Sequence, residues 1–220
     1  MKTGLIYNCT EELFSRAYAL TSGGEPYPLR SFLRQEIEKL AAKKILEVGC
    51  GTGRFAFPGY DYLGIDPNPH YVAYCRRRRP GRFQQMSGEQ LDLPDKTFDA
   101  VFCLAVGHHL PDNSLRRVLS EIDRVLSDDG VFFFTDLIRP IVRSRAVAAL
   151  LEWLDEGRWF RREEDYLELL GNQFVIEKKR RITDAFYQML VLVCRKNRNI
   201  ATRGIHVDAS GICVDQKVSV

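Results

Sequence analysis

Two apolar segments on either side of an amphipathic helix constrain the fold of this 220-residue chain most strongly. Residues 100–106 (Ala-Val-Phe-Cys-Leu-Ala-Val) and 131–137 (Val-Phe-Phe-Phe-Thr-Asp-Leu) are almost continuously apolar, as is typical of strands that are covered on both faces in a parallel sheet. The apolar residues between them recur at helical spacing and are Leu115, Val118, Leu119, Ile122, Val125 and Leu126. This strand, helix and strand predict a right-handed crossover between parallel strands.

The rest of the chain repeats this alternation. Apolar patterns predict helices at residues 29–40, 69–79, 147–154 and 163–170, and strands at 44–49, 62–66, 82–86, 174–182 and 187–195. The connector between the last two strands is short, so we expect them to pair antiparallel. The predicted fold class is α/β, with a doubly wound, seven-stranded and mostly parallel sheet and an antiparallel edge strand.

The two ends of the chain differ from this central pattern. Residues 1–28 mix aromatic and polar side chains and end in a turn-rich stretch, which predicts an N-terminal helical cap before the main domain. Residues 29–196 form the predicted domain. The tail at 197–220 carries little apolar pattern, and disorder, an extra edge strand and a foreign extension are all open interpretations of it.

A glycine-rich loop follows the first predicted strand. Gly49, Gly51 and Gly53 allow the backbone to turn tightly and a ligand to approach where a Cβ would collide. Their spacing differs from the GxGxxG of dinucleotide sites, and Pro58 shortens the helix expected next, so a pyrophosphate is less well explained. Asp66 ends the following strand, where a carboxylate can accept two ribose hydroxyls. The loop and Asp66 together predict an adenosine-containing cofactor.

Five motifs occur in order along the chain. They are Ile-Leu-Glu-Val-Gly-Cys-Gly-Thr-Gly at 45–53, Tyr-Leu-Gly-Ile-Asp at 62–66, Leu-Asp-Leu-Pro-Asp-Lys-Thr-Phe-Asp at 91–99, Val-Gly-His-His-Leu-Pro-Asp at 106–112 and Leu-Ser-Glu-Ile-Asp-Arg-Val-Leu-Ser-Asp-Asp-Gly at 119–130. Together they resemble the class I S-adenosylmethionine-dependent methyltransferases, in particular the small-molecule branch that includes ubiquinone-biosynthesis enzymes. The resemblance implies a Rossmann-like strand order 3-2-1-4-5-7-6, S-adenosylmethionine as cofactor and S-adenosylhomocysteine as product.

The resemblance also implies the cofactor-binding residues. Those that match the family are Glu47, Gly49, Cys50 and Gly51 at the methionine end, Asp66 at the ribose, Pro67 or Asn68 at the adenine edge, and Leu104 at the end of the fourth strand. Relatives carry an acidic residue after the third strand where this chain has Ser87. The Ser87 hydroxyl, the Glu89 carboxylate and the amides of Gly88 and Glu89 are the alternatives for that contact. Arg30 or Arg54 is expected to pair with the methionine carboxylate.

Methyl transfer from a sulfonium is an in-line displacement, so the protein must mainly align the reactants and exclude water. His108 follows the fourth strand and is the candidate catalytic residue, as a general base for an acceptor that carries a proton. The alternative is that the His108-His109 turn only packs beneath the cofactor. Asp136 and Arg139 are candidates to orient a polar acceptor. Aromatic residues that suggest either an acceptor site or ordinary core are Tyr7, Phe14, Tyr18, Tyr27, Trp153, Trp159 and Phe160.

Composition excludes several other partners. The net charge is only +3, and the arginine run at 76–79 falls at the end of a predicted helix, where cations complement the helix dipole, so no nucleic-acid partner is expected. The six cysteines show no zinc-like grouping, so we predict no metal and mostly buried thiols. No signal peptide or apolar span appears, which predicts no membrane partner and a cytoplasmic protein.

The sequence therefore predicts a methyltransferase for a small-molecule acceptor, acting as a monomer or homodimer. Two other functions stay open at this point. Ser87 and the short helix after the loop also fit a non-catalytic protein that binds the cofactor, and the sheet with its glycine loop also fits a nicotinamide-dependent oxidoreductase.

Overall fold

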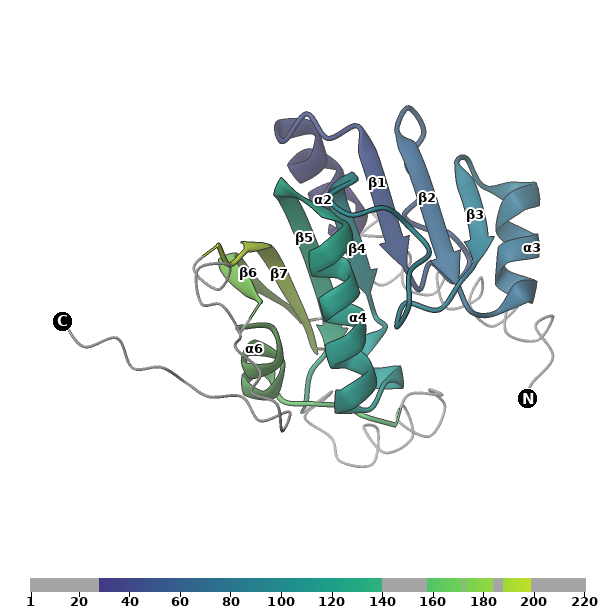
Figure 1. The fold of residues 1–220 in the computed structure, drawn as a ribbon. Helices are drawn as coiled ribbons and strands as arrows, with labels where there is room; N and C mark the ends of the chain where they lie inside the picture. Colours follow the sequence, from purple (N-terminus) through teal and green to yellow (C-terminus); the bar gives the residue numbers. More distant parts are fainter. Residues whose placement is uncertain (1–27, 140–157, 172, 184–187, 199–220) are drawn as a thin grey trace, which may run out of the picture.

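The computed structural model describes residues 28–139, 158–171, 173–183 and 188–198 (Figure 1). Their strands form one seven-stranded sheet in the order β3-β2-β1-β4-β5-β7-β6. Strands β1 to β5 are parallel to one another, whereas β7 runs antiparallel to both β5 and β6. The predicted α/β class, the strand order and the antiparallel element are all confirmed, and β6 is the strand at the edge.

The elements lie close to their predicted positions. The helices are α2 (Pro28–Lys39), α3 (Pro69–Arg78), α4 (Asp112–Val125) and α6 (Glu163–Gly171), with a short 3-10 turn η1 (Gly107–His109). The strands are β1 (Lys44–Val48), β2 (Asp61–Asp66), β3 (Arg82–Gln85), β4 (Phe98–Leu104), β5 (Leu126–Leu137), β6 (Phe174–Thr183) and β7 (Gln188–Lys196). The expected helix at 147–154, the helical cap up to residue 27 and the tail from 199 lie outside the described residues.

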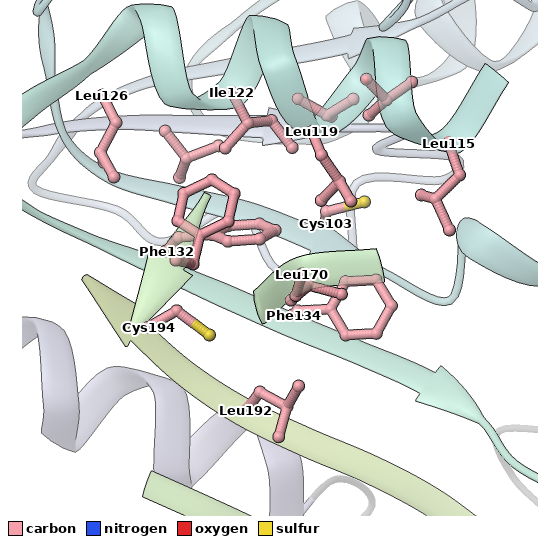
Figure 2. Packing of buried hydrophobic residues seen from close by; sticks show 14 of the residues in the cluster. Cys103, Leu115, Leu119, Ile122, Leu126, Phe132, Phe134, Leu170, Leu192 and Cys194 are labelled. Atoms are coloured by element: carbon pink, nitrogen blue, oxygen red, sulfur yellow. The ribbon is translucent and has the colours of Figure 1, made fainter. Parts of the chain in front are cut away.

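The core has two layers, one on each face of the sheet. Helices α4 and α6 cover one face, and Figure 2 shows Leu115, Leu119 and Ile122 of α4 over Phe132 and Phe134 of β5. Helices α2 and α3 contribute to the core on the opposite face. Burying a Leu, Ile or Phe side chain contributes about 1.5–3 kcal/mol, so these two faces hold the sheet between helices. This double cover explains why β4 and β5 read as continuous apolar runs.

Three local features differ from the sequence-based expectation. Strand β4 ends at Leu104, two residues early, because Ala105 adopts a positive φ of 56° and turns the chain into η1. Strand β5 begins at Leu126, directly after α4, rather than at Val131. No helix forms in the described stretch from Gly49 to Tyr60, so the short helix expected after the glycine loop is absent.

Candidate cofactor and acceptor site

The glycine loop leaves the carboxyl end of β1 with three residues in the left-handed region. The φ angles of Gly49, Gly51 and Gly53 are 73°, 49° and 66°. Residues other than glycine adopt such positive φ angles only at a cost in conformational free energy. A Cβ on Gly49 would lie 2.5 Å from Val106 Cγ2, so the loop is packed against the segment that follows β4. A Cβ on Gly51 would meet no atom within 4 Å, so open space lies beside the middle of the loop.

Asp66 holds the loop from the end of the neighbouring strand. Its Oδ2 accepts a hydrogen bond from Gly51 N at 2.9 Å and its Oδ1 accepts one from Asn68 N at 2.8 Å. Burial raises the pKa of the Asp66 carboxyl, while these two hydrogen bonds act in the opposite direction. Each oxygen retains acceptor capacity beyond its one amide bond. Gly51 and Asp66, each predicted to contact the cofactor, are therefore brought together at the ends of β1 and β2.

Glu47 is the penultimate residue of β1 and is buried. The Tyr62 hydroxyl of β2 donates a hydrogen bond to its Oε2. Burial raises the pKa of Glu47 to about 8, although the Tyr62 hydrogen bond and the charge of Arg30 oppose the shift. The carboxyl group is therefore poised between its neutral and charged forms near physiological pH, and a nearby cation would favour the charged form.

Arg30 of α2 reaches the far side of the same loop. It donates to the carbonyl oxygens of Arg54 at 3.2 Å and Ala56 at 3.3 Å, and its guanidinium carbon lies 4.6 Å from the centroid of the Phe57 ring. These contacts fix residues 54–57 in the absence of a helix there. Arg30 thus lies at the loop and bonds to the loop's backbone carbonyls.

Cys50 and Cys75 pack beneath the loop. Both side chains are buried and are free thiols, as are the buried Cys103 and Cys194, which agrees with the predicted thiols. Cys75 Sγ donates to Gly51 O at 3.2 Å, and the hydrogen-bond contact with Cys75 together with burial raises the pKa of the Cys50 thiol well above its ordinary value. The neutral Cys50 side chain is part of the support of the loop.

The loop after β3 approaches the same edge of the sheet. A Cβ on Gly88 would lie 2.6 Å from Val48 Cγ1, which places this turn directly against β1. Ser87 Oγ accepts from Glu89 N at 3.2 Å, and the Glu89 carboxylate pairs with Arg117 of α4 at 2.7 Å. Ser87 is exposed, whereas the Glu89 carboxylate already has a cationic partner. Of the two alternatives at this position, Ser87 is therefore better placed for a new contact.

His108 lies in η1, just beyond the end of β4. Its Nδ1 is 2.5 Å from Asp136 Oδ1, its amide N donates to Asp136 Oδ2 at 3.2 Å, and its ring stacks on Phe160 with centroids 5.2 Å apart. The side chain is only 2% exposed, and Asp136 is fully buried. Both carboxylate oxygens of Asp136, a predicted acceptor contact, lie within hydrogen-bond distance of His108. His109 is exposed beside it.

The segment at residues 158–162 lies against the same turn. The amides of Arg158 and Trp159 donate to His108 O at 3.0 and 2.9 Å, and Trp159 is 40% exposed. Arg139, the other expected acceptor contact, is exposed and lies 5.9 Å from the Phe160 ring centroid. The other aromatic candidates, Tyr7, Phe14, Tyr18, Tyr27 and Trp153, lie outside the described residues.

Arg161 is a functional candidate that the sequence did not single out. It is 6% exposed and bonds to four residues of the turn and its own segment. Its neighbours in sequence are the buried Phe160 and the exposed Arg162, and an arginine is not expected to be buried from the sequence alone. Its hydrogen bonds to the turn after β4 form only because the fold brings these two distant segments together.

Neither a metal site nor a membrane span is found in the part of the chain that the structure describes. No group of three or more His, Cys, Asp or Glu side chains is arranged to hold a metal ion there. No described helix is long and apolar enough to cross a membrane.

The comparisons with known proteins agree with this geometry. Residues 46–134 match the family model described as a methyltransferase domain. Over these residues the chain is similar to methyltransferase domains. The matched segment runs from the middle of β1 through most of β5, and it therefore contains both the glycine loop and the His108 turn.

Two curated relatives are similar to part of this chain. The fatty-acid O-methyltransferase of Mycolicibacterium smegmatis is 39% identical over 103 residues, 43% of this chain and 37% of that protein. The human thiol S-methyltransferase TMT1B is 39% identical over 101 residues, 41% of each chain. The chain thus spans about two fifths of the length of these relatives.

Solved structures share the fold at low sequence identity. An S-adenosylmethionine-dependent methyltransferase from Clostridium acetobutylicum has a TM-score of 0.63 at 13% identity, over 85% of this chain and 99% of that one. The magnesium protoporphyrin IX methyltransferase of Synechocystis, solved with bound S-adenosylhomocysteine, has a TM-score of 0.59 at 21% identity, over 76% and 80% of the two chains. These likenesses support the Rossmann-like fold of the family.

Proposed function

We propose that this protein binds S-adenosylmethionine and transfers its methyl group to a small-molecule acceptor. The observation that carries the proposal is the joining of Gly51 N to Asp66 Oδ2 at the carboxyl ends of β1 and β2, beside open space at Gly51. A carboxylate at this place in a doubly wound sheet is suited to ribose hydroxyls. The relatives named for fatty-acid and thiol methylation support a small-molecule acceptor.

The roles of the cofactor residues follow from their positions. Asp66 accepts the ribose hydroxyls, and the backbone of Gly49, Cys50 and Gly51 faces the methionine portion. Glu47 offsets a positive charge at that end, since its pKa of about 8 leaves it able to ionise beside a cation. Arg30 remains the proposed partner of the methionine carboxylate.

The adenine side is built from the tips of three strands. Pro67 and Asn68 follow β2, Ser87 and Gly88 follow β3, and Leu104 ends β4. We assign the polar adenine contact to Ser87, because Glu89 is paired with Arg117. The sulfonium supplies an activated methyl group, and the chain contributes orientation and exclusion of water.

We further propose His108 as the proton acceptor for acceptors that must lose a proton. Its Nδ1 faces Asp136, so Nε2 is the nitrogen assigned to the acceptor proton. Two acceptor probes distinguish a role of His108 in proton transfer from a role in packing alone. A fatty acid is already ionised at neutral pH, whereas an alkanethiol is mostly protonated, so His108→Asn should slow thiol methylation much more than carboxylate methylation. Equal slowing of both would assign His108 to packing alone.

Two measurements test the proposed function. Calorimetric titration with S-adenosylhomocysteine should show binding, and radiolabelled S-adenosylmethionine should label at least one fraction of a cell metabolite extract. Binding without any transfer would favour the non-catalytic alternative, and binding of NADH in place of S-adenosylhomocysteine would favour the oxidoreductase. The ubiquinone-like branch, the cytoplasmic location, the absence of a nucleic-acid partner and the monomer or homodimer remain predictions.

A further inference from the structure

Arg161 joins segments that are distant in sequence at the carboxyl ends of β4 and β5. Its Nη1 donates to Gly107 O at 2.7 Å and to Trp159 O at 3.0 Å, and its Nη2 donates to Leu110 O at 2.6 Å. Its Nε and Nη2 also reach Asp112 Oδ1 at 2.9 and 2.6 Å. One buried guanidinium therefore holds the whole turn from Gly107 to Asp112 against the segment at 158–162.

The opposite side of this turn is held by packing. A Cβ on Gly107 would lie 2.6 Å from Asp136 Oδ2 and 3.1 Å from Tyr166 Cε1, so the backbone of the turn packs closely against β5 and α6. Arg161 also lies above the Tyr166 ring, with its guanidinium carbon 5.5 Å from the centroid. Packing and Arg161 together restrain the turn from both directions.

This turn borders the cofactor loop on one side and carries His108 on the other. Val106 packs against Gly49, and the next two residues are Gly107 and His108. A shift of the turn would therefore move His108 relative to the glycine loop. A displacement of about 1 Å between reacting groups can cost about 100-fold in rate.

We propose that Arg161 is a positioning residue that sets His108 and the acceptor side of the site relative to the cofactor loop. The inference rests on the proposed function. Arginine suits the task because its rigid fork presents five donors, enough for three carbonyl oxygens and one carboxylate oxygen. Lysine, with three donors on a flexible stem, can satisfy only part of this set.

The test compares Arg161→Met and Arg161→Lys with Arg162→Met, a control at the exposed neighbouring arginine. Methyl transfer to an alkanethiol probe should fall about 100-fold in kcat in Arg161→Met, with part of the rate restored in Arg161→Lys. Titration with S-adenosylhomocysteine should give an unchanged affinity. The ¹⁵N spectrum of the His108 ring should lose the signature of its Asp136 bond in Arg161→Met and keep it in the control.

The outcomes separate this inference from the proposed function. If the wild type methylates no probe, the histidine spectrum still tests whether Arg161 positions His108. If Arg161→Met does not fold, Arg161→Lys and Asp112→Asn carry the same measurements, because the Asp112 side chain is 64% exposed. A normal His108 spectrum and normal kcat in a folded Arg161 variant would overturn the proposal, as would a kcat loss matched by an equal loss in Arg162→Met.

Discussion

The proposed cofactor side and the proposed acceptor side of this site are built in different ways. The cofactor side uses backbone amides and two adjacent strands, so its central contact joins residues only 15 positions apart, Gly51 and Asp66. The acceptor side joins the turn after β4, the end of β5 and a segment about 50 residues beyond the turn, through Asp136 and Arg161. One side is a local structure shaped by glycine, and the other depends on buried polar side chains from distant segments.

Loss of Asp136 should have the largest effect, because it breaks the buried support of the acceptor side. Removing one partner of a buried ionic or strongly hydrogen-bonded pair costs about 3–5 kcal/mol. Asp136→Ala should lower the free energy of unfolding by that amount in chemical denaturation, while Asp129→Ala, at a 93% exposed side chain on the same strand, should change little. If Asp136→Ala left stability unchanged, the acceptor side would not depend on buried polar contacts.

Glu47 should make the stability of the cofactor side depend on pH. Its pKa is raised from 4.5 to about 8 in the folded protein, so the unfolded chain ionises first and the folded state loses relative stability as the pH rises between those values. The loss is at most about 1.4 kcal/mol per pH unit. Unfolding free energies measured from pH 5 to 8 should fall in the wild type more steeply than in Glu47→Gln. Parallel profiles of the two proteins would refute the raised pKa.

Asp66→Ala should weaken cofactor binding without disturbing the acceptor side. Hydrogen bonds to a charged group contribute about 1.5–3 kcal/mol, which is roughly 10- to 100-fold in the affinity for S-adenosylhomocysteine. Asp61→Ala is the matched control, because Asp61 starts the same strand and pairs with Arg82 at its exposed end. Unchanged affinity in Asp66→Ala would refute the ribose assignment.

The smallest effect compares two glycines of one loop. Gly49→Ala should destabilise the protein by about 1–3 kcal/mol, because its Cβ would meet Val106 at 2.5 Å, in addition to the cost of its positive φ. Gly51→Ala carries the cost of positive φ alone, since nothing lies within 4 Å. In thermal unfolding, Gly49→Ala should therefore have a lower Tm than Gly51→Ala. Adding Val106→Ala to Gly49→Ala should restore part of the lost stability. Equal loss in both glycine variants would contradict the close approach of loop and turn.

The sequence was most informative where its signals are local. Helical apolar spacing located α2 and α4, and apolar runs located the strands of the sheet apart from the early start of β5, because burial on two faces leaves few alternatives for such runs. The sequence was less reliable at the ends of helices and strands, because tertiary contacts decide where an element ends. Ala105 ends β4 early while its amide bonds to Thr135 O, and Arg30 holds residues 54–57 where a helix was expected.

By itself, the sequence determined the sheet, the glycine loop and the strand-end acid, since glycine conformation and strand position are properties of neighbouring residues. Only the tertiary structure decided which polar groups meet. It paired Glu47 with Tyr62, Glu89 with Arg117 and Asp136 with His108, and it buried Arg161 in the turn. These partners lie 15 to 54 positions apart, and a buried charge is stable only where such a partner is brought to it.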